Sequence, residues 1–168
     1  ARLLRHDLDF HAEDSKYASH NFHSFPAKFP PQLPAKFIEN LTAVGDTVLD
    51  PMSGSGTTVL EALLANRRGV GFDIDPLAVL ISRVKTTPLR RSAVGRIGTE
   101  VLERARRSAS TRRQALLSSL ACRWDSSTRA FVDYWFASEA QVELAALVDA
   151  IQQVQEPAVK AFLELVFS

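Results

Sequence analysis

The sequence contains almost no cysteine: Cys122 is the single one among 168 residues. One cysteine excludes an internal disulfide and any site built from several cysteines, so zinc is not expected. Long apolar runs are also missing, because stretches such as residues 115–121 and 158–168 fall well short of the ~20 residues that cross a bilayer. We therefore expect a globular, cytoplasmic protein with one domain or slightly more, and no membrane segment.

Acidic residues are scarce in the middle of the chain. Residues 83–129 contain 12 Lys and Arg against 3 Asp and Glu, a net charge of +9, whereas residues 1–82 carry −3 and residues 130–168 carry −5. This middle block is the part expected to bind a polyanion such as DNA, although a solvated helix face is the simpler explanation. Its arginines are Arg90, Arg91, Arg96, Arg104, Arg106, Arg107, Arg112, Arg113, Arg123 and Arg129.

Strand-forming segments are few, and they lie in the first half. Residues 47–50 are apolar and β-branched and predict a buried strand, and residues 69–73 predict a second one. Helical spacing predicts a helix over residues 57–67 that Gly69 closes, and another that begins at Pro76 with Asp75 as its N-cap. Pro34 opens an earlier helix that ends near Leu41. Residues 47–85 thus form a β-loop-α-β-α unit, the start of a parallel doubly wound sheet.

The second half reads as helices. Apolar spacing predicts one over residues 92–120, a second that Ser138 caps with Gln141 three residues on, and a last one at Glu156-Pro157. Two strands are few for a sheet, which has ~5–6 on average, so either some helices are misassigned or half of the fold lies elsewhere. We divide the chain into a cofactor-binding core over residues 1–87 and a helical, basic segment over residues 88–168.

A glycine-rich turn follows the first predicted strand. It lacks the third glycine of the dinucleotide fingerprint, the lysine of a phosphate-binding loop and the spacing of an esterase elbow. What remains is a turn that an acid precedes and two hydroxyls follow, which suits a zwitterionic ligand: Asp50 faces an ammonium, and the helix-start amides with Thr57 and Thr58 face a carboxylate. Asp73, after the second strand, is placed to accept ribose hydroxyls, and Ile74 to cover an adenine.

These segments resemble the cofactor motifs of the N6-adenine and N4-cytosine DNA methyltransferases. The turn reads Asp50-Pro51-Met52-Ser53-Gly54-Ser55-Gly56-Thr57-Thr58, and residues 71–76 resemble the ribose-binding motif. Residues 23–33 resemble the upstream motif beside the methionine end of S-adenosylmethionine, which implies donors from His23, Ser24 and Lys28 and a pocket wall from Phe29. The resemblance implies a Rossmann-like S-adenosylmethionine-dependent α/β fold, incomplete in this chain, with a helical appendage. The cofactor residues it implies are His23, Lys28, Phe29, Asp50, Pro51, Ser53, Gly54, Ser55, Gly56, Thr57, Thr58, Asp73 and Ile74.

One family motif is missing. Members hold the target amine against an Asp/Asn/Ser-Pro-Pro-aromatic tetrapeptide, but the one Pro-Pro here is Pro30-Pro31, between Phe29 and Gln32. We therefore expect the tetrapeptide past Ser168, in missing sequence or in a second chain that also completes the sheet. The expected function is methylation of the exocyclic amine of cytosine or adenine in flipped DNA bases, with this chain inactive alone. The alternatives are a non-catalytic cofactor- or DNA-binding subunit of a split methyltransferase and an RNA guanine amino-methyltransferase.

Several residues also have simpler explanations. Lys28 and His23 can also simply tie down a proline-rich loop. The spacing of His6, His11, His20 and His23 fits no metal signature, so no metal site is predicted. An aromatic group at Trp124, Tyr134, Trp135 and Phe136 can stack on bases, but core packing is the stronger expectation.

Overall fold

The computed structural model describes residues 3–5, 8–10, 12–26 and 28–168. The chain forms two compact units, Ala1–Pro88 and Leu89–Ser168, and each is described by itself. Among the described residues, no helix is both long and apolar enough to span a membrane.

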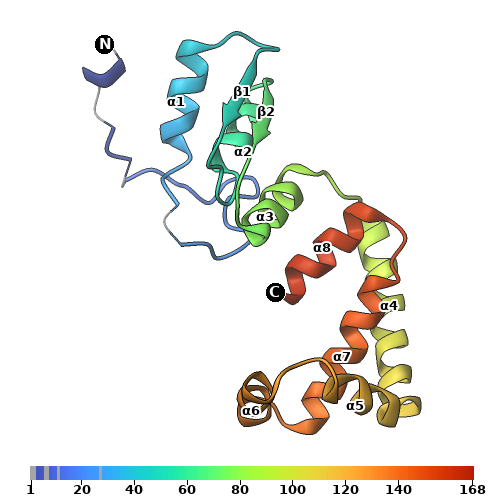
Figure 1. Ribbon diagram of the computed structural model, residues 1–168. Helices are drawn as coiled ribbons and strands as arrows, with labels where there is room; N and C mark the ends of the chain where they lie inside the picture. Colours follow the sequence, from blue (N-terminus) through green and yellow to red (C-terminus); the bar gives the residue numbers. More distant parts are fainter. Residues whose placement is uncertain (1–2, 6–7, 11, 27) are drawn as a thin grey trace. The chain divides into compact units, whose positions relative to one another are not determined.

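The first unit combines a small parallel sheet with helices (Figure 1). Its elements, in chain order, are η1 (Leu3–Arg5), α1 (Gln32–Leu41), β1 (Thr47–Asp50), α2 (Thr57–Leu64), β2 (Arg68–Gly71) and α3 (Pro76–Thr86). The strands β1 and β2 pair in parallel, from Thr47 opposite Arg68 to Asp50 opposite Gly71. Because α2 forms the crossover, the carboxyl ends of both strands lie at the same edge, where the glycine-rich turn and Asp73 follow.

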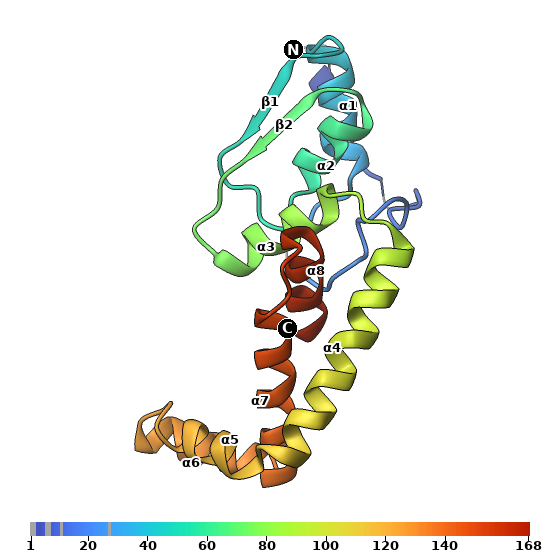
Figure 2. The ribbon, with the colours of Figure 1, turned by 90° about the vertical axis from the view of Figure 1, so that its right-hand side faces the viewer.

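Helix α2 packs closely on one face of this sheet, as Figure 2 shows. Gly69 permits the approach, since a Cβ there would lie 2.7 Å from the Val59 carbonyl oxygen. The opposite face is open: Leu49 of β1 is 58% exposed, and Val70 and Phe72 are exposed beside it. The prediction of a buried first strand is therefore wrong, because among the described residues only one layer of helices covers the sheet.

Three boundaries differ from the predicted ones, each for a local reason. Helix α1 begins at Gln32, before Pro34, which the first turn of a helix tolerates. Helix α2 ends at Leu64 rather than residue 67, and Asn66, with φ of 57°, takes the left-handed position expected of Gly69. Strand β2 covers Arg68–Gly71 rather than residues 69–73. The start of α3 is as predicted: the Asp75 carboxylate accepts the Leu77 amide at 2.9 Å.

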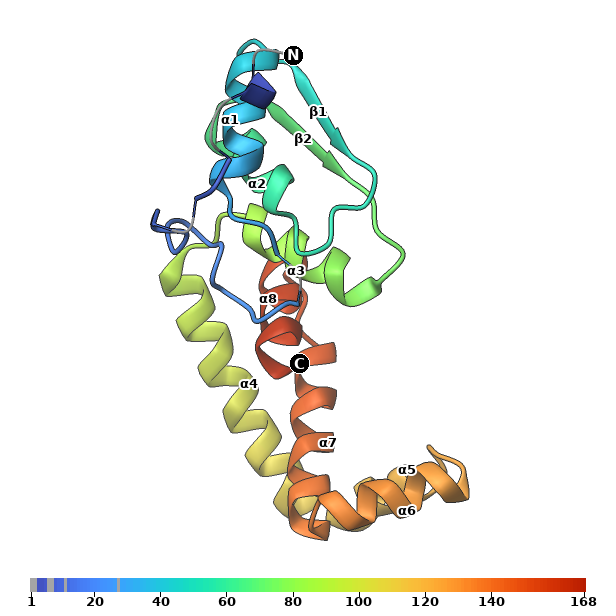
Figure 3. The same ribbon diagram turned by 90° about the vertical axis from the view of Figure 1, so that its left-hand side faces the viewer.

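The second unit is entirely helical, as the sequence predicted (Figure 3). It consists of α4 (Arg91–Thr111), α5 (Arg113–Ala121), α6 (Ser126–Trp135), α7 (Ser138–Gln152) and α8 (Pro157–Phe167). Helices α4 and α7 run side by side, and their apolar faces meet α5 and α8 in one core. The buried members of that core are Ile97, Val101, Ala105, Leu116, Val142, Ala146, Ala150, Ile151 and Val159.

Three predictions for this unit are wrong. The helix over residues 92–120 is two helices, because Arg112 leaves helical geometry with φ of −117° and ψ of 20°. Ser138 is the first residue of α7 rather than its cap, and the Gln141 side-chain Nε2 instead donates to the Phe136 carbonyl at 2.8 Å. Helix α6 was not predicted, and its aromatic side chains do not pack in a core: Tyr134 is 80% exposed, and Phe131 and Trp135 are exposed with it.

Candidate cofactor site

The glycine-rich turn after β1 is fastened to the segment after β2. The Phe72 amide donates to the Asp50 carbonyl at 3.0 Å, and the Ser53 amide donates to the Phe72 carbonyl at 2.9 Å. These bonds continue the pairing of the strands past their ends. They bring the turn beside Asp73, although 19 residues separate Gly54 from Asp73.

Two backbone amides hold the Asp73 carboxylate. Its Oδ2 accepts the Gly54 amide at 2.7 Å, and its Oδ1 accepts the Asp75 amide at 2.9 Å. These two bonds, with that from Asp75 the stronger influence, lower the pKa of Asp73 below its ordinary value. A carboxylate has more lone pairs than these bonds use, so an ionised, fixed acceptor stands at the end of β2.

The turn enters α2 through a glycine that no other residue replaces without strain. Gly56 has φ of 77° and is the N-cap of α2, with no side-chain cap. A Cβ at this position would lie 2.9 Å from the Ser82 Cα of α3. The first amides of a helix have no acceptor within it, so this uncapped helix start presents donors and a partial positive charge to an anion.

Two buried polar atoms near the turn lack a partner. The Ser55 Oγ and the His23 Nδ1 have no hydrogen-bond partner among the described residues. Buried polar atoms are rarely left unsatisfied, and a ligand supplies the missing partner at many such sites. The residues present thus fit a ligand that carries both hydrogen-bond donors and acceptors, as S-adenosylmethionine does.

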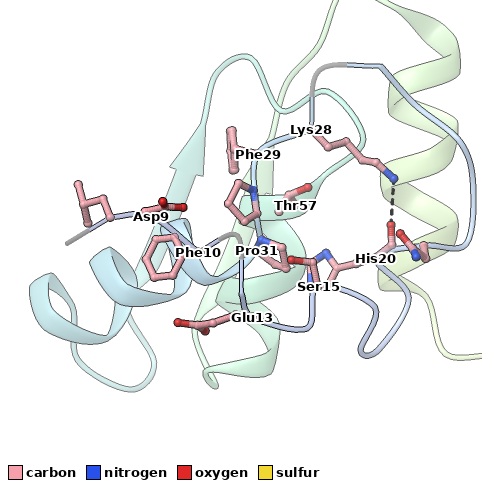
Figure 4. A pocket seen from close by; sticks show the side chains of 12 residues that line it. Asp9, Phe10, Glu13, Ser15, His20, Lys28, Phe29, Pro31 and Thr57 are labelled. Carbon is pink, nitrogen blue, oxygen red and sulfur yellow. Dashed lines mark hydrogen bonds between the residues drawn. The ribbon is translucent and has the colours of Figure 1, made fainter.

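A cavity of about 500 Å³ lies between the N-terminal segment and Thr57, the first residue of α2 (Figure 4). It brings together three of the predicted residues, Lys28, Phe29 and Thr57. The carboxylates of Asp9 and Glu13 and the ring of Phe10 also line it, and acidic and aromatic groups favour a cationic ligand. The complete lining is Leu8, Asp9, Phe10, Glu13, Ser15, His20, Asn21, Lys28, Phe29, Pro30, Pro31 and Thr57.

The bonds and exposure of the predicted cofactor residues differ from one residue to the next. The Lys28 ammonium donates to the His20 and His23 carbonyl oxygens, at 3.3 and 3.2 Å, and so ties down its own loop. The Asp50 carboxylate accepts the Met52 amide at 3.1 Å. The Ile74 side chain is 100% exposed. Of the remainder, Ser53 is buried, Thr58 is half-buried, and Pro51 and Ser24 are exposed.

Sequence reasoning missed a buried polar network behind the cavity. The His20 Nε2 lies 2.6 Å from Glu61 Oε1, which also accepts the Tyr17 hydroxyl at 2.9 Å. Burial, with this bond to Glu61, raises the pKa of Tyr17. The one available signal was Glu61 itself, an acid on the otherwise apolar face that Leu60 and Ala62 form.

Sequence reasoning also missed a buried lysine. The Lys85 ammonium of α3 donates to the Ser55 carbonyl oxygen at 2.9 Å. The histidines form no metal site in the described part of the chain: His6 and His11 lie outside it, and no cluster of three His, Cys, Asp or Glu occurs in it.

Comparison with known proteins shows which proteins this chain is similar to. Residues 8–83 match the DNA methylase family, N6_N4_Mtase. The chain is 30% identical over 166 residues to the Type II methyltransferase M.MvaI of Kocuria varians, which covers 96% of the chain and 35% of that protein. It is 38% identical over 82 residues to M.MjaII of Methanocaldococcus jannaschii and 46% identical over 56 residues to M.BglI of Bacillus subtilis, both Type II methyltransferases; these matches cover 49% and 33% of the chain.

The chain is therefore similar to the DNA amino-methyltransferases, whose family model matches residues 8–83. It spans about a third of the length of M.MvaI, and the matched parts are 15% and 16% of M.MjaII and M.BglI. The match to M.MvaI extends through both units. No solved structure matches the chain.

Proposed function

We propose that the first unit carries the S-adenosylmethionine site of a DNA methyltransferase that modifies an exocyclic amine, the N4 of cytosine or the N6 of adenine. The observation that carries this proposal is the Asp73 carboxylate, held by the Gly54 and Asp75 amides beside the glycine-rich turn. A fixed, ionised acceptor at the end of a second parallel strand suits the two ribose hydroxyls of a nucleoside cofactor.

Each end of the cofactor then has a partner. When bound, S-adenosylmethionine supplies an electrophilic methyl group on a sulfonium sulfur. Asp73 accepts the ribose hydroxyls, and the exposed Ile74 side chain covers the adenine. The open amides at the start of α2, with Thr57 and Thr58, receive the carboxylate. The acidic and aromatic lining of the cavity, from Asp9, Glu13 and Phe29, favours the cationic end.

The Rossmann-like fold is part of the same proposal. Strands β1 and β2 with α2 form one parallel β-α-β crossover unit. Ligands of such sheets bind beyond the carboxyl ends of the strands. The open sheet face around Leu49 and Phe72 needs a second layer, because parallel sheets are covered on both faces. We propose that polypeptide outside these 168 residues provides it, together with further strands.

The basic block of the second unit is proposed to bind the DNA backbone. Three of its arginines form ion pairs: Arg96 with Glu100, Arg113 with Glu139 and Arg129 with Asp133. The exposed arginines Arg106, Arg107, Arg112 and Arg123 have no ion pair of this kind within the described residues. An excess of exposed, unneutralised arginine on a surface favours contacts with phosphates.

A second candidate is a subunit of a split enzyme, which binds cofactor or DNA and depends on another chain for catalysis. It is favoured by one observation: the 168 residues contain no Asp/Asn/Ser-Pro-Pro-aromatic tetrapeptide to accept the hydrogens of the target amine. Both candidates place the amine-binding groups on polypeptide other than these residues. An RNA guanine amino-methyltransferase shares the tetrapeptide chemistry, and the nucleic acid that accepts the methyl group separates it from both.

A transfer assay tests this proposal. The protein is incubated with methyl-labelled cofactor and with DNA or RNA of mixed sequence, both alone and with a polypeptide that carries the tetrapeptide. We expect label in DNA in the combined reaction, recovered as N4-methylcytosine or N6-methyladenine after digestion. Label in RNA guanine would transfer the proposal to the RNA alternative. Label in DNA from the 168 residues alone would show that the amine-binding groups lie within them.

A further inference from the structure

Lys85 is the one lysine or arginine that is buried among the described residues, with 7% of its surface exposed. Its ammonium donates to the Ser55 carbonyl oxygen at 2.9 Å. Its own carbonyl accepts the Ser19 hydroxyl at 2.8 Å, which ties the same residue to the N-terminal segment. A buried ammonium without a carboxylate partner is costly, so its position calls for an explanation beyond packing.

The bond from Lys85 fixes one peptide group of the glycine-rich turn. The peptide between Ser55 and Gly56 has its carbonyl bound by Lys85, and its amide donates to the Ser53 carbonyl at 2.8 Å. Both ends of this peptide are therefore held, immediately before the first residue of α2. A flip of the peptide would exchange these two directions, point the Ser55 carbonyl oxygen at the Ser53 carbonyl oxygen, and change the backbone through which the turn enters α2.

We propose that Lys85 is a positioning residue for the cofactor turn: its buried ammonium, bonded to the Ser55 carbonyl, holds the turn in the conformation that receives the carboxylate of the cofactor. This inference rests on the proposed function, because it takes the start of α2 as the carboxylate site. Lys85 touches the turn rather than the ligand, and it acts through the orientation of the Ser55–Gly56 peptide.

The position of Lys85 also makes the turn sensitive to pH. Burial, followed by the nearby charge of Lys28, lowers the pKa of Lys85 to about 8. The charged bond to Ser55 is therefore present below pH 8 and is lost as the pH rises through that value. The titratable or charged groups on the elements around Lys85 include Tyr17, His20 and Lys28 of the N-terminal segment, Glu61 of α2 and Arg83 of α3 itself.

A bound carboxylate at the start of α2 would favour the charged form of Lys85 and raise its pKa. Ligand affinity would then be constant below pH 8 and would fall by up to about tenfold per pH unit above it. Lys85→Arg keeps a charge that does not titrate in this range, so its affinity should vary less with pH. Lys85→Met removes the donor and should bind at least about tenfold more weakly at pH 7.

Two measurements test the proposal. The first is the carbonyl ¹³C resonance of Ser55 in the ligand-free protein between pH 6.5 and 9.5, where we expect a transition near pH 8 that neither Lys85→Arg nor Lys85→Met shows. The second is calorimetric titration with S-adenosylhomocysteine across the same range, which needs no turnover. Lys160→Met is the matched control, because Lys160 also donates to a backbone carbonyl, that of Gln152 at 3.1 Å, in the other unit.

The possible outcomes separate this inference from the proposed function. A wild-type Ser55 carbonyl that does not titrate, or a folded Lys85→Met variant that binds like the wild type, overturns the role of Lys85 and leaves the cofactor proposal standing. The titration of the Ser55 carbonyl uses the wild-type protein, so it tests the inference even if a variant fails to fold. If Ser55 titrates through Lys85 but the protein binds no S-adenosylhomocysteine, Lys85 positions the turn and the cofactor proposal fails.

Discussion

Replacement of Gly56 by alanine tests whether the turn has the geometry described above. The left-handed φ of 77° costs an L-residue ~1–2 kcal/mol. The new Cβ would also lie 2.7 Å from the Ser82 Cβ and 2.9 Å from its Cα. Overpacking of this kind costs a further ~1–3 kcal/mol, because the backbone of α3 must move. The expected loss of stability in the first unit is therefore ~2–5 kcal/mol.

The matched control is Gly45→Ala, which has φ of 90° and nothing within 4 Å of the new Cβ, so it carries the strain without the clash. We expect it to cost ~1–2 kcal/mol. Hydrogen exchange of the α2 amides in urea measures the first unit, and tryptophan fluorescence provides an internal reference, because Trp124 and Trp135 both lie in the second. Equal effects of the two substitutions would refute the close approach of the turn to α3.

Three further predictions concern other parts of the chain. Glu61→Ala leaves the His20 imidazole and the Tyr17 hydroxyl without their shared acceptor. We expect urea unfolding to show that the free energy of unfolding falls by ~2–5 kcal/mol. Replacement of the exposed Glu39 by alanine should change this free energy little, and similar values for both variants would count against the network. Reversal of Arg106, Arg107 and Arg112 to Glu should strongly weaken DNA binding at low salt and reduce the salt slope by up to ~0.9 per lost phosphate contact. Reversal of Arg96, which is paired with Glu100, should do much less, and equal losses would argue against a localised surface. Because the pKa of Asp73 is lowered in the folded protein, its carboxylate stabilises the turn at and above pH 3.8, and this effect is lost as the pH falls further. The Gly54 amide resonance should therefore move only below pH 3.8, and it should not move in Asp73→Asn.

The sequence predicted those elements whose signals are local. The boundaries of β1 are as predicted, because the apolar run from Thr47 to Asp50 stands between a glycine and a proline. The cap of α3 is as predicted, because Asp75 before Pro76 satisfies the first amides through its own side chain. Asp73 follows the second strand, as predicted, and the parallel pairing of β1 and β2 brings it to the edge of the sheet where the turn begins.

Features that depend on distant partners were not predictable in this way. The burial of Lys85 depends on a carbonyl 30 residues away, and its sequence context is that of an ordinary helix end. The break between α4 and α5 occurs at Arg112, where neither proline nor glycine marks it. The aromatic group at Trp124, Tyr134, Trp135 and Phe136 suggested a core, yet Tyr134, Trp135 and Phe136 are exposed.

The central claim is that Asp73 binds the ribose of S-adenosylmethionine, and the most direct test measures that contact alone. S-adenosylhomocysteine and its 2′-deoxy analogue are titrated calorimetrically into the wild type and into Asp73→Ala. The matched control is Asp75→Ala, which removes a different carboxylate close to Asp73. We predict that the wild type binds the ribose form roughly tenfold or more tightly than the analogue, that Asp75→Ala keeps this preference, and that Asp73→Ala loses it. A folded Asp73→Ala variant that keeps the wild-type affinity and the same preference for the ribose form would contradict the account.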